Sequence, residues 1–410
     1  METEKIVITG MGAVTPIGIG VDPYWTSLIQ GISGIDTIQK LDVAALPIKV
    51  AGEVKNFRAK DYMPARLANS MEDFMQYAYV SAEEALASSG LELDPLRTGI
   101  VMSTALGGLC AIERTQRKLS EEGTRVGPKL MSRILGNIAA AQFAISHHIQ
   151  GPSLTVSTAC ASGNDAIATA CTLLKAGDTD TMVVMGGESG GSALLIQSLA
   201  RALALTSNPD PITACRPFDA NRNGFVVGEG GGSLILETEE HALARNATIL
   251  AEIAGYASNN DAFHVIAPHN AGDGARRCMV SAMEHAGLSP DQIDYINAHG
   301  TSTETGDAVE VMAIHSALGK RAKEIGVSST KGATGHLMGS GGITEAIACV
   351  QAIRTGILPP TLHYQTPDPL CDLDVIPNTP RHQVIHTAMS NAFGFGGQNA
   401  CVIFKEYRGQ

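Results

Sequence analysis

The chain has 410 residues, of which 44% are hydrophobic and 17% charged, so it is long enough for two or three domains or one duplicated fold and too apolar for disorder. Its net charge of −12 opposes non-specific nucleic-acid binding, and no apolar run reaches the ~18 residues of a membrane-spanning helix. Eight cysteines without clustered spacing fit a reducing compartment, so we expect a cytoplasmic protein that binds neither nucleic acid nor membrane.

The first predicted strand runs into a glycine-rich segment that resembles a phosphate-binding loop. Residues 6–9 read IVIT, and residues 10–18 read GMGAVTPIG. The third glycine of a dinucleotide-binding GxGxxG motif would fall on Thr15, so a nucleotide site is not expected. Apolar spacing then predicts helices around 24–30 and 66–88, a strand at 99–103, and, after a polar stretch to Pro128, a helix that ends at His147.

A strand, a tight turn and a small apolar helix surround Cys160. Residues 154–157 form a β-branched run, and residues 161–175 form a helical segment that stops before Gly177. The turn places Cys160 at the helix N-terminus, where free N–H groups and the positive end of the dipole favour a thiolate. We therefore expect Cys160 to be a nucleophile. The other cysteines lack such a turn and are expected to be inert: Cys110, Cys171, Cys215, Cys278, Cys349, Cys371 and Cys401.

The second half of the chain repeats the first in the same order. The sequence VSSTK at 327–331 stands where VSTAC stands at 156–160, and ACVIF at 400–404 matches SLILE at 233–237. Repeated units of strands and apolar helices imply two sheets packed on shared central helices. Sites that follow equivalent strands should then face each other across the junction.

We place that junction after residue 245. The N-terminal half, 1–245, carries the expected nucleophile, and the C-terminal half, 246–410, carries two histidines and a lysine after predicted strands.

Strand ends in the two halves offer a set of reactive groups. His299 follows one predicted strand, Lys331 and His336 lie in the loop after another, and Phe395 lies in a glycine-rich turn after a third. A Cys/His hydrolase or acyltransferase would need only one imidazole as base. A zinc site could recruit Cys160 and both histidines, although no closely spaced ligand pair supports it. A carbon–carbon bond-forming acyltransferase would use both imidazoles as neutral donors to an enolate oxygen.

Four motifs together resemble one enzyme family. They are STACASG at 157–163, NAHGTST at 297–303, STKGATGH at 329–336 and SNAFGFGG at 390–397. In this order they are similar to the elongating β-ketoacyl-[acyl-carrier-protein] synthases of the thiolase superfamily. The resemblance implies a duplicated α/β fold with five αβαβα layers, decarboxylative condensation of an acyl group with a malonyl-carrier, no cofactor, no metal, an acyl carrier protein as partner, and a homodimer.

The resemblance also implies roles for the residues. Cys160 would carry the acyl chain, its N–H and that of Phe395 would form the oxyanion hole, and His299 and His336 would donate to the malonyl carbonyl. Lys331 would hold the histidines in place through Glu345 and Asp307, because a buried ammonium needs carboxylates. Further positions match supporting roles: Thr301 and Thr303 for the phosphopantetheine arm, Phe395 as a gate hinged on Gly394, Gly396 and Gly397, and Leu106 for chain length. Phe393 is expected to be a core aromatic.

The sequence departs from the family pattern where the carrier would dock. Asn69 and Ser70 stand where relatives often have basic residues, and Ile266 stands where relatives commonly have threonine. The basic residues that remain as docking candidates are Arg66, Arg125, Lys129, Arg133 and Arg201. These differences keep a dedicated polyketide or polyene pathway open as an alternative to fatty-acid elongation. A non-condensing partner subunit is a further alternative, although such partners generally lack the cysteine.

Overall fold

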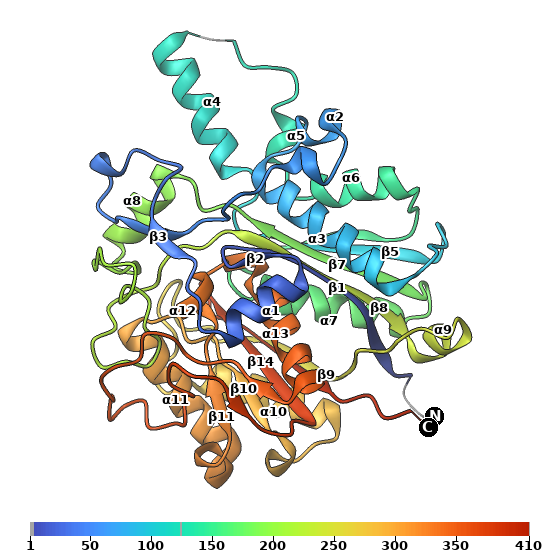
Figure 1. Cartoon of the computed structure of the whole chain (residues 1–410), viewed down its shortest axis with the longest axis vertical. Coiled ribbons are helices and arrows are strands. Elements are labelled where there is room, and N and C mark those ends of the chain that lie inside the picture. The colour runs from blue at the N-terminus through green and yellow to red at the C-terminus, as the bar shows by residue number, and fades with distance from the viewer. Residues whose placement is uncertain (1–3, 124, 410) are drawn as a thin grey trace.

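The computed structural model describes residues 4–123 and 125–409, and Figure 1 shows its two halves stacked one above the other. The upper half contains β1 (Ile6–Thr15), β2 (Gly18–Ile19), α1 (Val21–Ile29), β3 (Ile35–Thr37), β4 (Val50–Gly52), α2 (Ala65–Ala68), α3 (Asp73–Ser89), β5 (Thr98–Ser103), α4 (Leu109–Glu122), α5 (Met131–Ile134), α6 (Ile138–His147), β6 (Ser153–Val156), α7 (Ser162–Lys175), β7 (Thr181–Glu188), α8 (Ala193–Arg201), β8 (Gly230–Thr238) and α9 (Glu239–Ala244).

The lower half continues the chain to its C-terminus. It contains β9 (Ala251–Asn260), α10 (Asp273–Ala286), β10 (Tyr295–Asn297), α11 (Glu304–Leu318), β11 (Gly326–Ser328), α12 (Lys331–Thr334), α13 (Gly341–Thr355), β12 (Ile357–Leu358), β13 (Arg381–His382), β14 (Thr387–Gly394) and β15 (Gln398–Lys405). Five short 3₁₀ turns also occur in the described residues: Val43–Ala45, Ala59–Asp61, Pro290–Gln292, Gly319–Lys323 and Met338–Ser340.

The strand order of the two halves is the same. One half runs β1-β8-β7-β5-β6 and the other runs β9-β15-β14-β10-β11. In each half the first three strands pair antiparallel, and the last three pair parallel. The predicted duplication is therefore confirmed, and β6, which precedes Cys160, is the equivalent of β11, which precedes Lys331. The boundary after residue 245 stays a prediction.

The two halves share one sheet, which the sequence did not lead us to expect. Residues 6–8 of β1 pair antiparallel with residues 251–253 of β9, so the halves join edge to edge rather than forming two separate sheets. Both are edge strands of their own half, and an edge strand gains backbone hydrogen bonds from such a partner.

The five predicted layers are present. Helices α3 and α6 cover the outer face of the upper half, α10 and α11 cover that of the lower half, and α7 and α13 lie between the two. The central pair approach closely because both helices carry glycine at their crossing. A Cβ on Gly163 of α7 would lie 2.9 Å from the Gly342 Cα of α13. This close approach brings the N-termini of the two helices, and the turns before them, to one place.

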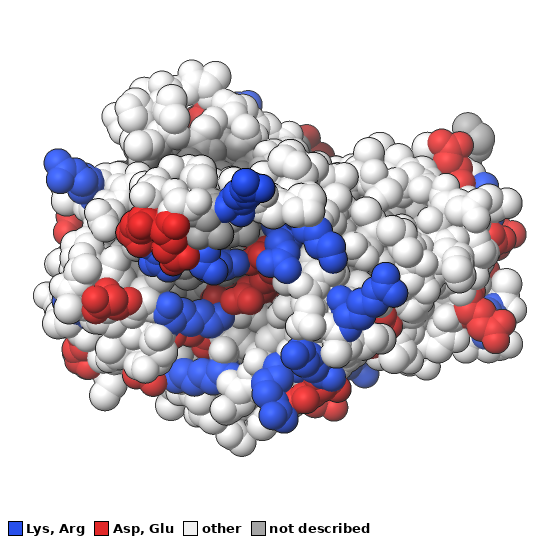
Figure 2. Space-filling view, turned by 90° about the horizontal axis from the view of Figure 1, so that it is seen from above, with Lys and Arg blue, Asp and Glu red and all other residues white. Residues whose placement is uncertain are grey.

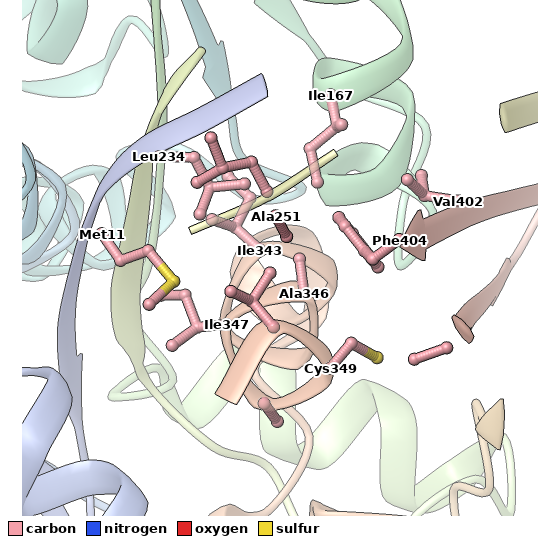
Figure 3. Close-up of a cluster of buried hydrophobic side chains, with 14 of the residues drawn as sticks. Met11, Ile167, Leu234, Ala251, Ile343, Ala346, Ile347, Cys349, Val402 and Phe404 are labelled. Atoms are coloured by element: carbon pink, nitrogen blue, oxygen red, sulfur yellow. The ribbon is translucent and has the colours of Figure 1, made fainter. Parts of the chain in front are cut away.

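The central helices are held by an apolar cluster from both halves (Figure 3). Ile343 and Ile347 of α13 lie on the side of Leu234 of β8, and Phe404 of β15 lies on the opposite side of the helix, toward Ala346. Each of these side chains is fully buried. Fixing both helices from both sheet halves makes the junction a rigid support for the turns that precede the helices.

Several element predictions were wrong in detail. The glycine-rich segment after residue 9 continues β1 to Thr15 instead of forming a loop, and the helix expected over 66–88 is split into α2 and α3. The polar stretch before Pro128 contains α4, which stands out at the top of the molecule (Figure 1) and buries only Cys110 and Ala111. Within the described ranges, no helix has the length and apolar character needed to cross a bilayer.

Candidate active site

Cys160 lies in a constrained turn between β6 and α7. The residue before it, Ala159, has φ of +52°, a left-handed conformation that is unfavourable for a residue other than glycine. Two hydrogen bonds hold this turn: the Thr158 N–H donates to Ser162 Oγ at 2.8 Å, and Ser162 Oγ donates to the Ala159 carbonyl at 2.6 Å. Strained backbone of this kind is typical of functional sites, and here the turn places Cys160 in the lining of a cavity.

The other predicted strand ends lie close to the Cys160 turn. β10 pairs in parallel with both β11 and β14, so the groups after their carboxyl ends lie at one edge of the sheet. A cavity of about 840 Å³ opens there. Its lining contains nine of the predicted residues, seven of which are not glycine: Cys160, His299, His336, Phe395, Thr301, Thr303 and Leu106. Gly394 and Gly397 also line it, whereas Lys331, Asp307 and Glu345 lie buried behind the lining.

His336 contacts the nucleophile directly. Its Nε2 lies 2.9 Å from Cys160 Sγ, and its Nδ1 accepts a hydrogen bond from the Met338 N–H at 3.3 Å. Because Nδ1 accepts, the proton of the neutral ring is assigned to Nε2, which then donates toward sulfur. Burial and, secondarily, the Lys331 charge hold the pKa of His336 well below its usual value. The ring is therefore a neutral donor at physiological pH.

His299 forms the second face of the same site. Its ring lies edge-to-face with His336, with centroids 5.3 Å apart, and with Phe393 at 5.7 Å. Burial, Lys331 and His336 together hold the pKa of His299 well below its usual value. Phe393, expected to be a plain core aromatic, lines the cavity instead and fixes the His299 ring.

Lys331 is neutralised by one of its two predicted partners. Its Nζ pairs with Glu345 in a buried ion pair. Asp307 pairs with Arg222 instead, at 3.7 Å, and accepts hydrogen bonds from the N–H groups of Phe218 at 2.8 Å and Ser302 at 3.1 Å. The prediction for Asp307 was wrong because these groups already surround its carboxylate. The Lys331 ammonium, paired with Glu345, therefore lies behind the two histidines and opposes their protonation.

The Phe395 turn touches Cys160 through its backbone. The Phe395 N–H lies close enough to the Cys160 sulfur to lower the pKa of the thiol. A Cβ on Gly394 would lie 2.8 Å from the Thr158 carbonyl oxygen and 3.0 Å from the Cys160 nitrogen, so only glycine permits the approach. Gly396 and Gly397 have φ of +84° and +73°, which favours glycine at the following turn.

The thiolate expected at Cys160 is not the resting state. Burial raises the pKa of the thiol to about 12, against smaller opposing effects of Lys331 and the Phe395 N–H. Cys160 lies two residues before α7, and the helix-terminus effect is worth only about 0.3–1 kcal/mol. Desolvation of the charged form outweighs it.

This raised pKa leads to a prediction for chemical labelling. The rate at which iodoacetamide alkylates Cys160 should rise about tenfold per pH unit from pH 7 to pH 10, because only the thiolate reacts. Peptide mass spectrometry at each pH measures the rate for this residue alone. A plateau below pH 8 would instead support a thiolate held by the helix dipole.

Two buried carboxylates support the site and were missed from the sequence. Glu310 of α11 accepts the N–H groups of His299 at 2.8 Å and Gly300 at 2.7 Å. Glu188, the last residue of β7, accepts the N–H groups of Leu106 at 3.2 Å and Gly339 at 3.1 Å, and so joins two loops that line the cavity. Burial raises the pKa of each to about 7. An acidic residue inside an apolar helix or strand is the signal that could have found them.

The hydroxyls expected to hold the phosphopantetheine arm lie side by side. Thr301 Oγ1 and Thr303 Oγ1 are 3.0 Å apart on the cavity wall. Over residues 4–123 and 125–409, no group of three His, Cys, Asp or Glu side chains is arranged to hold a metal ion. The geometry therefore offers hydrogen-bond donors to a carbonyl oxygen beside a thiol, and nothing that resembles a zinc site.

Comparison with known proteins assigns the family. The sequence model of the β-ketoacyl synthase N-terminal domain matches residues 3–242, and that of the C-terminal domain matches residues 250–365. The chain belongs to the β-ketoacyl synthase family. This β-ketoacyl synthase is 41% identical over 410 residues to the 3-oxoacyl-[acyl-carrier-protein] synthase 2 of Staphylococcus aureus (strain COL), covering 99% of both chains.

Solved structures of polyketide ketosynthases are similar to the synthase in fold. The ishigamide ketosynthase/chain length factor matches with a TM-score of 0.93 and 32% identity, covering 99% of this chain and 100% of that one. A type II polyketide acyl-carrier protein in complex with its ketosynthase bound to the hexaketide matches with a TM-score of 0.91 and 31% identity, over 99% and 100% of the two chains.

Proposed function

We propose that Cys160, His299 and His336 together carry out the two half-reactions of a decarboxylative condensation. The synthase is a 3-oxoacyl-[acyl-carrier-protein] synthase, an acyltransferase of fatty-acid elongation, as its full-length relatives are. The observation that carries the assignment of residues is that the thiol and both neutral imidazoles open into one cavity.

In the first half-reaction, the Cys160 sulfur attacks the carbonyl carbon of an acyl thioester. A carbon–sulfur bond forms, the bond to the pantetheine sulfur breaks, and the Cys160 proton ends on the released pantetheine thiol. The N–H groups of Cys160 and Phe395 stabilise the tetrahedral oxyanion. Support comes from the turn of Phe395, whose preceding residue, Gly394, approaches the Cys160 backbone so closely that an added Cβ would lie 3.0 Å from the Cys160 nitrogen.

In the second half-reaction, a malonyl thioester binds where the released pantetheine arm of the first substrate was bound. Its carboxylate leaves as CO₂, and the electrons of the broken carbon–carbon bond form an enolate. His299 and His336 each donate a ring N–H to the enolate oxygen, which requires rings that stay neutral. The enolate carbon then attacks the acyl group, the new carbon–carbon bond forms, and the Cys160 thiolate leaves and takes up a proton from solvent.

The geometry disfavours a Cys/His hydrolase. In a hydrolytic triad the base is oriented by a carboxylate or amide that accepts its second N–H. Here His336 Nδ1 accepts the Met338 N–H instead of donating, so this ring is set to donate at Nε2. The presence of Cys160 and both histidines in the cavity also disfavours the role of a non-condensing partner subunit.

The acyl group extends from Cys160 into the apolar part of the cavity. Leu106, Phe225 and Met338 line this part, and the Leu106 position, fixed through Glu188, supports the proposal that its size limits the chain. A ketosynthase of a dedicated polyketide or polyene pathway is the second candidate, favoured by the solved relatives and by apolar Ile266 at the cavity. Mass spectrometry of the products formed from acyl-carriers of increasing length separates the two.

Phe395 provides a test of the proposed gate. Phe395→Ala should change turnover or the distribution of product lengths by about tenfold, because Phe395 lines the cavity with Cys160 and belongs to the apolar cluster of Leu106 and Phe225. The ring is only partly buried, so the thermal unfolding midpoint should stay close to that of the wild type. An unchanged rate and product profile would leave Phe395 with a packing role alone.

The proposed partner is an acyl carrier protein, and one face of the synthase carries basic side chains that would attract it. Figure 2 shows Lys and Arg side chains around a hollow on the face seen from above, the end of the molecule that carries α2, α4 and α5 in Figure 1. Of the predicted docking residues, Arg66, Arg125 and Lys129 are exposed, and so is Arg201 at the end of α8. Arg133 pairs with Glu72 at 3.4 Å, which reduces its attraction for an acidic partner.

A cytoplasmic homodimer is part of the same proposal. β6 forms one end of the sheet and pairs only with β5. Leu154 on this strand is 45% exposed, and Ile145 on the neighbouring α6 is 69% exposed. An open edge with apolar side chains supports pairing with a second copy about a two-fold axis. Sedimentation analysis of the purified chain tests it.

A further inference from the structure

Asp165 is a buried carboxylate beside the nucleophile turn, and the chemistry described above does not use it. It is the fourth residue of α7, which begins at Ser162, and it is 7% exposed. Its Oδ2 accepts a hydrogen bond from Thr158 Oγ1 at 2.6 Å. Burial raises the pKa of Asp165, and the hydroxyls of Thr158 and Ser258 lower it. The carboxylate therefore depends on hydroxyl groups for the hydrogen bonds that a buried polar group needs.

Stabilisation of the helix end does not explain why this carboxylate is buried. Asp165 lies in the first turn of α7, where a negative charge interacts favourably with the helix dipole. An exposed carboxylate would gain that interaction equally well, whereas burial of a charge costs free energy unless the group is hydrogen-bonded. The hydrogen bond from Thr158 therefore accounts for the buried position of the Asp165 side chain.

Thr158 is held at three points by the beginning of α7. Its N–H donates to Ser162 Oγ at 2.8 Å, and its carbonyl accepts the Ala161 N–H at 3.1 Å. Its hydroxyl donates to Asp165. Ser162 and Asp165 are three residues apart on the helix, so their side chains lie on one face of it. The backbone and the side chain of Thr158 are both fixed in this way.

Thr158 in turn determines where the nucleophile lies. The next residue, Ala159, has φ of +52°, and a strained conformation of this kind persists only where the surrounding contacts hold it in place. The Thr158 carbonyl also lies against the turn of Phe395, because an added Cβ on Gly394 would be 2.8 Å from its oxygen. A shift of Thr158 would therefore move Cys160 relative to that turn.

The second repeat has an acidic residue at the equivalent position of its own central helix. Residues 165–168 of α7 read DAIA, and residues 345–348 of α13 read EAIA. Glu345 pairs with Lys331, which follows β11 as Cys160 follows β6. In both halves, an acidic side chain of the central helix thus contacts the turn that follows the equivalent strand.

We propose that Asp165 is a positioning residue for acyl transfer: acting through the Thr158 hydroxyl, it holds the Cys160 sulfur and N–H in the geometry that attack on a thioester requires. The inference rests on the proposed function, which assigns this attack to Cys160. His299 follows β10 and His336 follows α12, so the contact supports neither imidazole. Its loss should slow acylation of the thiol and leave malonyl decarboxylation unchanged.

The test compares two substitutions of Asp165, with octanoyl-pantetheine as the acyl donor. Asp165→Ala should slow the acylation of Cys160 about tenfold, because small displacements of reacting atoms are costly. Asp165→Asn should stay within about twofold of the wild type, because its amide oxygen still accepts the Thr158 hydroxyl. Intact-protein mass spectrometry follows the acyl-enzyme with time. Enzyme acylated beforehand should release labelled CO₂ from malonyl-pantetheine at the wild-type rate in both variants.

Thr158 provides a second route to the same contact. Thr158→Val removes the donor and should slow acylation as much as Asp165→Ala does. The double variant should be no slower than either single variant, because both remove one interaction. Asp273→Ala is the control: Asp273 is the acidic residue in the first turn of α10, and its loss should change neither rate.

Four results would overturn the proposal. Asp165→Asn as slow as Asp165→Ala would assign the carboxylate to the charge of the helix end, and additive losses in the double variant would remove Thr158 from the route. Equal slowing of acylation and decarboxylation, with a lowered thermal unfolding midpoint, would make Asp165 a residue of the fold. Acylation at the wild-type rate in Asp165→Ala would defeat this inference alone. A wild-type enzyme that acquires no octanoyl group at Cys160 would instead defeat the proposed function, and this inference with it.

Discussion

Cys160→Ala is expected to abolish condensation, with a loss of roughly 10³-fold or more, the scale on which removing a nucleophile acts. Cys160 is the only cysteine among the described residues that line the cavity, so without it no thiol can hold an acyl group beside the histidines. The measurement is β-ketoacyl product formed from an acyl-carrier and a malonyl-carrier. A thiol reagent present in one equivalent should label the wild type and spare the variant.

Cys171→Ala is the matched control. Cys171 lies on the same helix, α7, is fully buried, and has a thiol whose pKa burial also raises to about 12. It faces the core and not the cavity, so the variant should keep its activity and its single label. Undiminished product from Cys160→Ala would assign the chain to the non-condensing partner class.

The part of the site that follows from topology was predictable. Once the repeat is recognised, Cys160 and Lys331 must follow equivalent strands, and parallel neighbours end at one edge of the sheet. Those rules place His299 and Phe395 beside them without any knowledge of side-chain packing. The fold's five layers follow from the same repeat, because the apolar central helices need a sheet face on both sides and the outer face of each sheet half needs a covering layer of helices.

Other features leave no pattern in the sequence. Pairing between β1 and β9 uses backbone groups only, so it has no signature in the side chains. For Glu310 and Glu188 the sequence shows only an acidic residue within an apolar segment, and it does not show which backbone N–H groups they accept, because those partners carry no distinguishing residue type. Whether the pKa of the Cys160 thiol is raised or lowered depends on how completely the turn is buried, which a strand-turn-helix pattern does not determine. The ion pair of Asp307 with Arg222 joins residues far apart in the sequence, Arg222 lying between α8 and β8, and no local pattern predicts it.

Loss of either histidine should separate the two half-reactions. His299→Ala and His336→Ala are each expected to retain transfer of the acyl group to Cys160 and to lower malonyl decarboxylation by about 10²–10³-fold, the effect of removing one donor to a developing oxyanion. Acyl-enzyme is measured by intact-protein mass spectrometry, and decarboxylation by release of labelled CO₂. His285→Ala is the control, because that ring packs on Tyr256 and bonds Lys175 away from the cavity.

The pH dependence distinguishes donors from acids or bases that titrate. Both imidazole pKa values lie well below the ordinary value of 6.5, so the neutral, donating forms persist as pH falls and are lost only at still lower pH. Decarboxylation by the wild type should therefore stay level from pH 8 to pH 6, where an unperturbed histidine would gain its proton. An acidic limb near pH 6.5 would contradict the neutral pair. Normal decarboxylation with lost acylation in either variant would reverse the assignment, making that histidine a partner of the thiol rather than of the enolate.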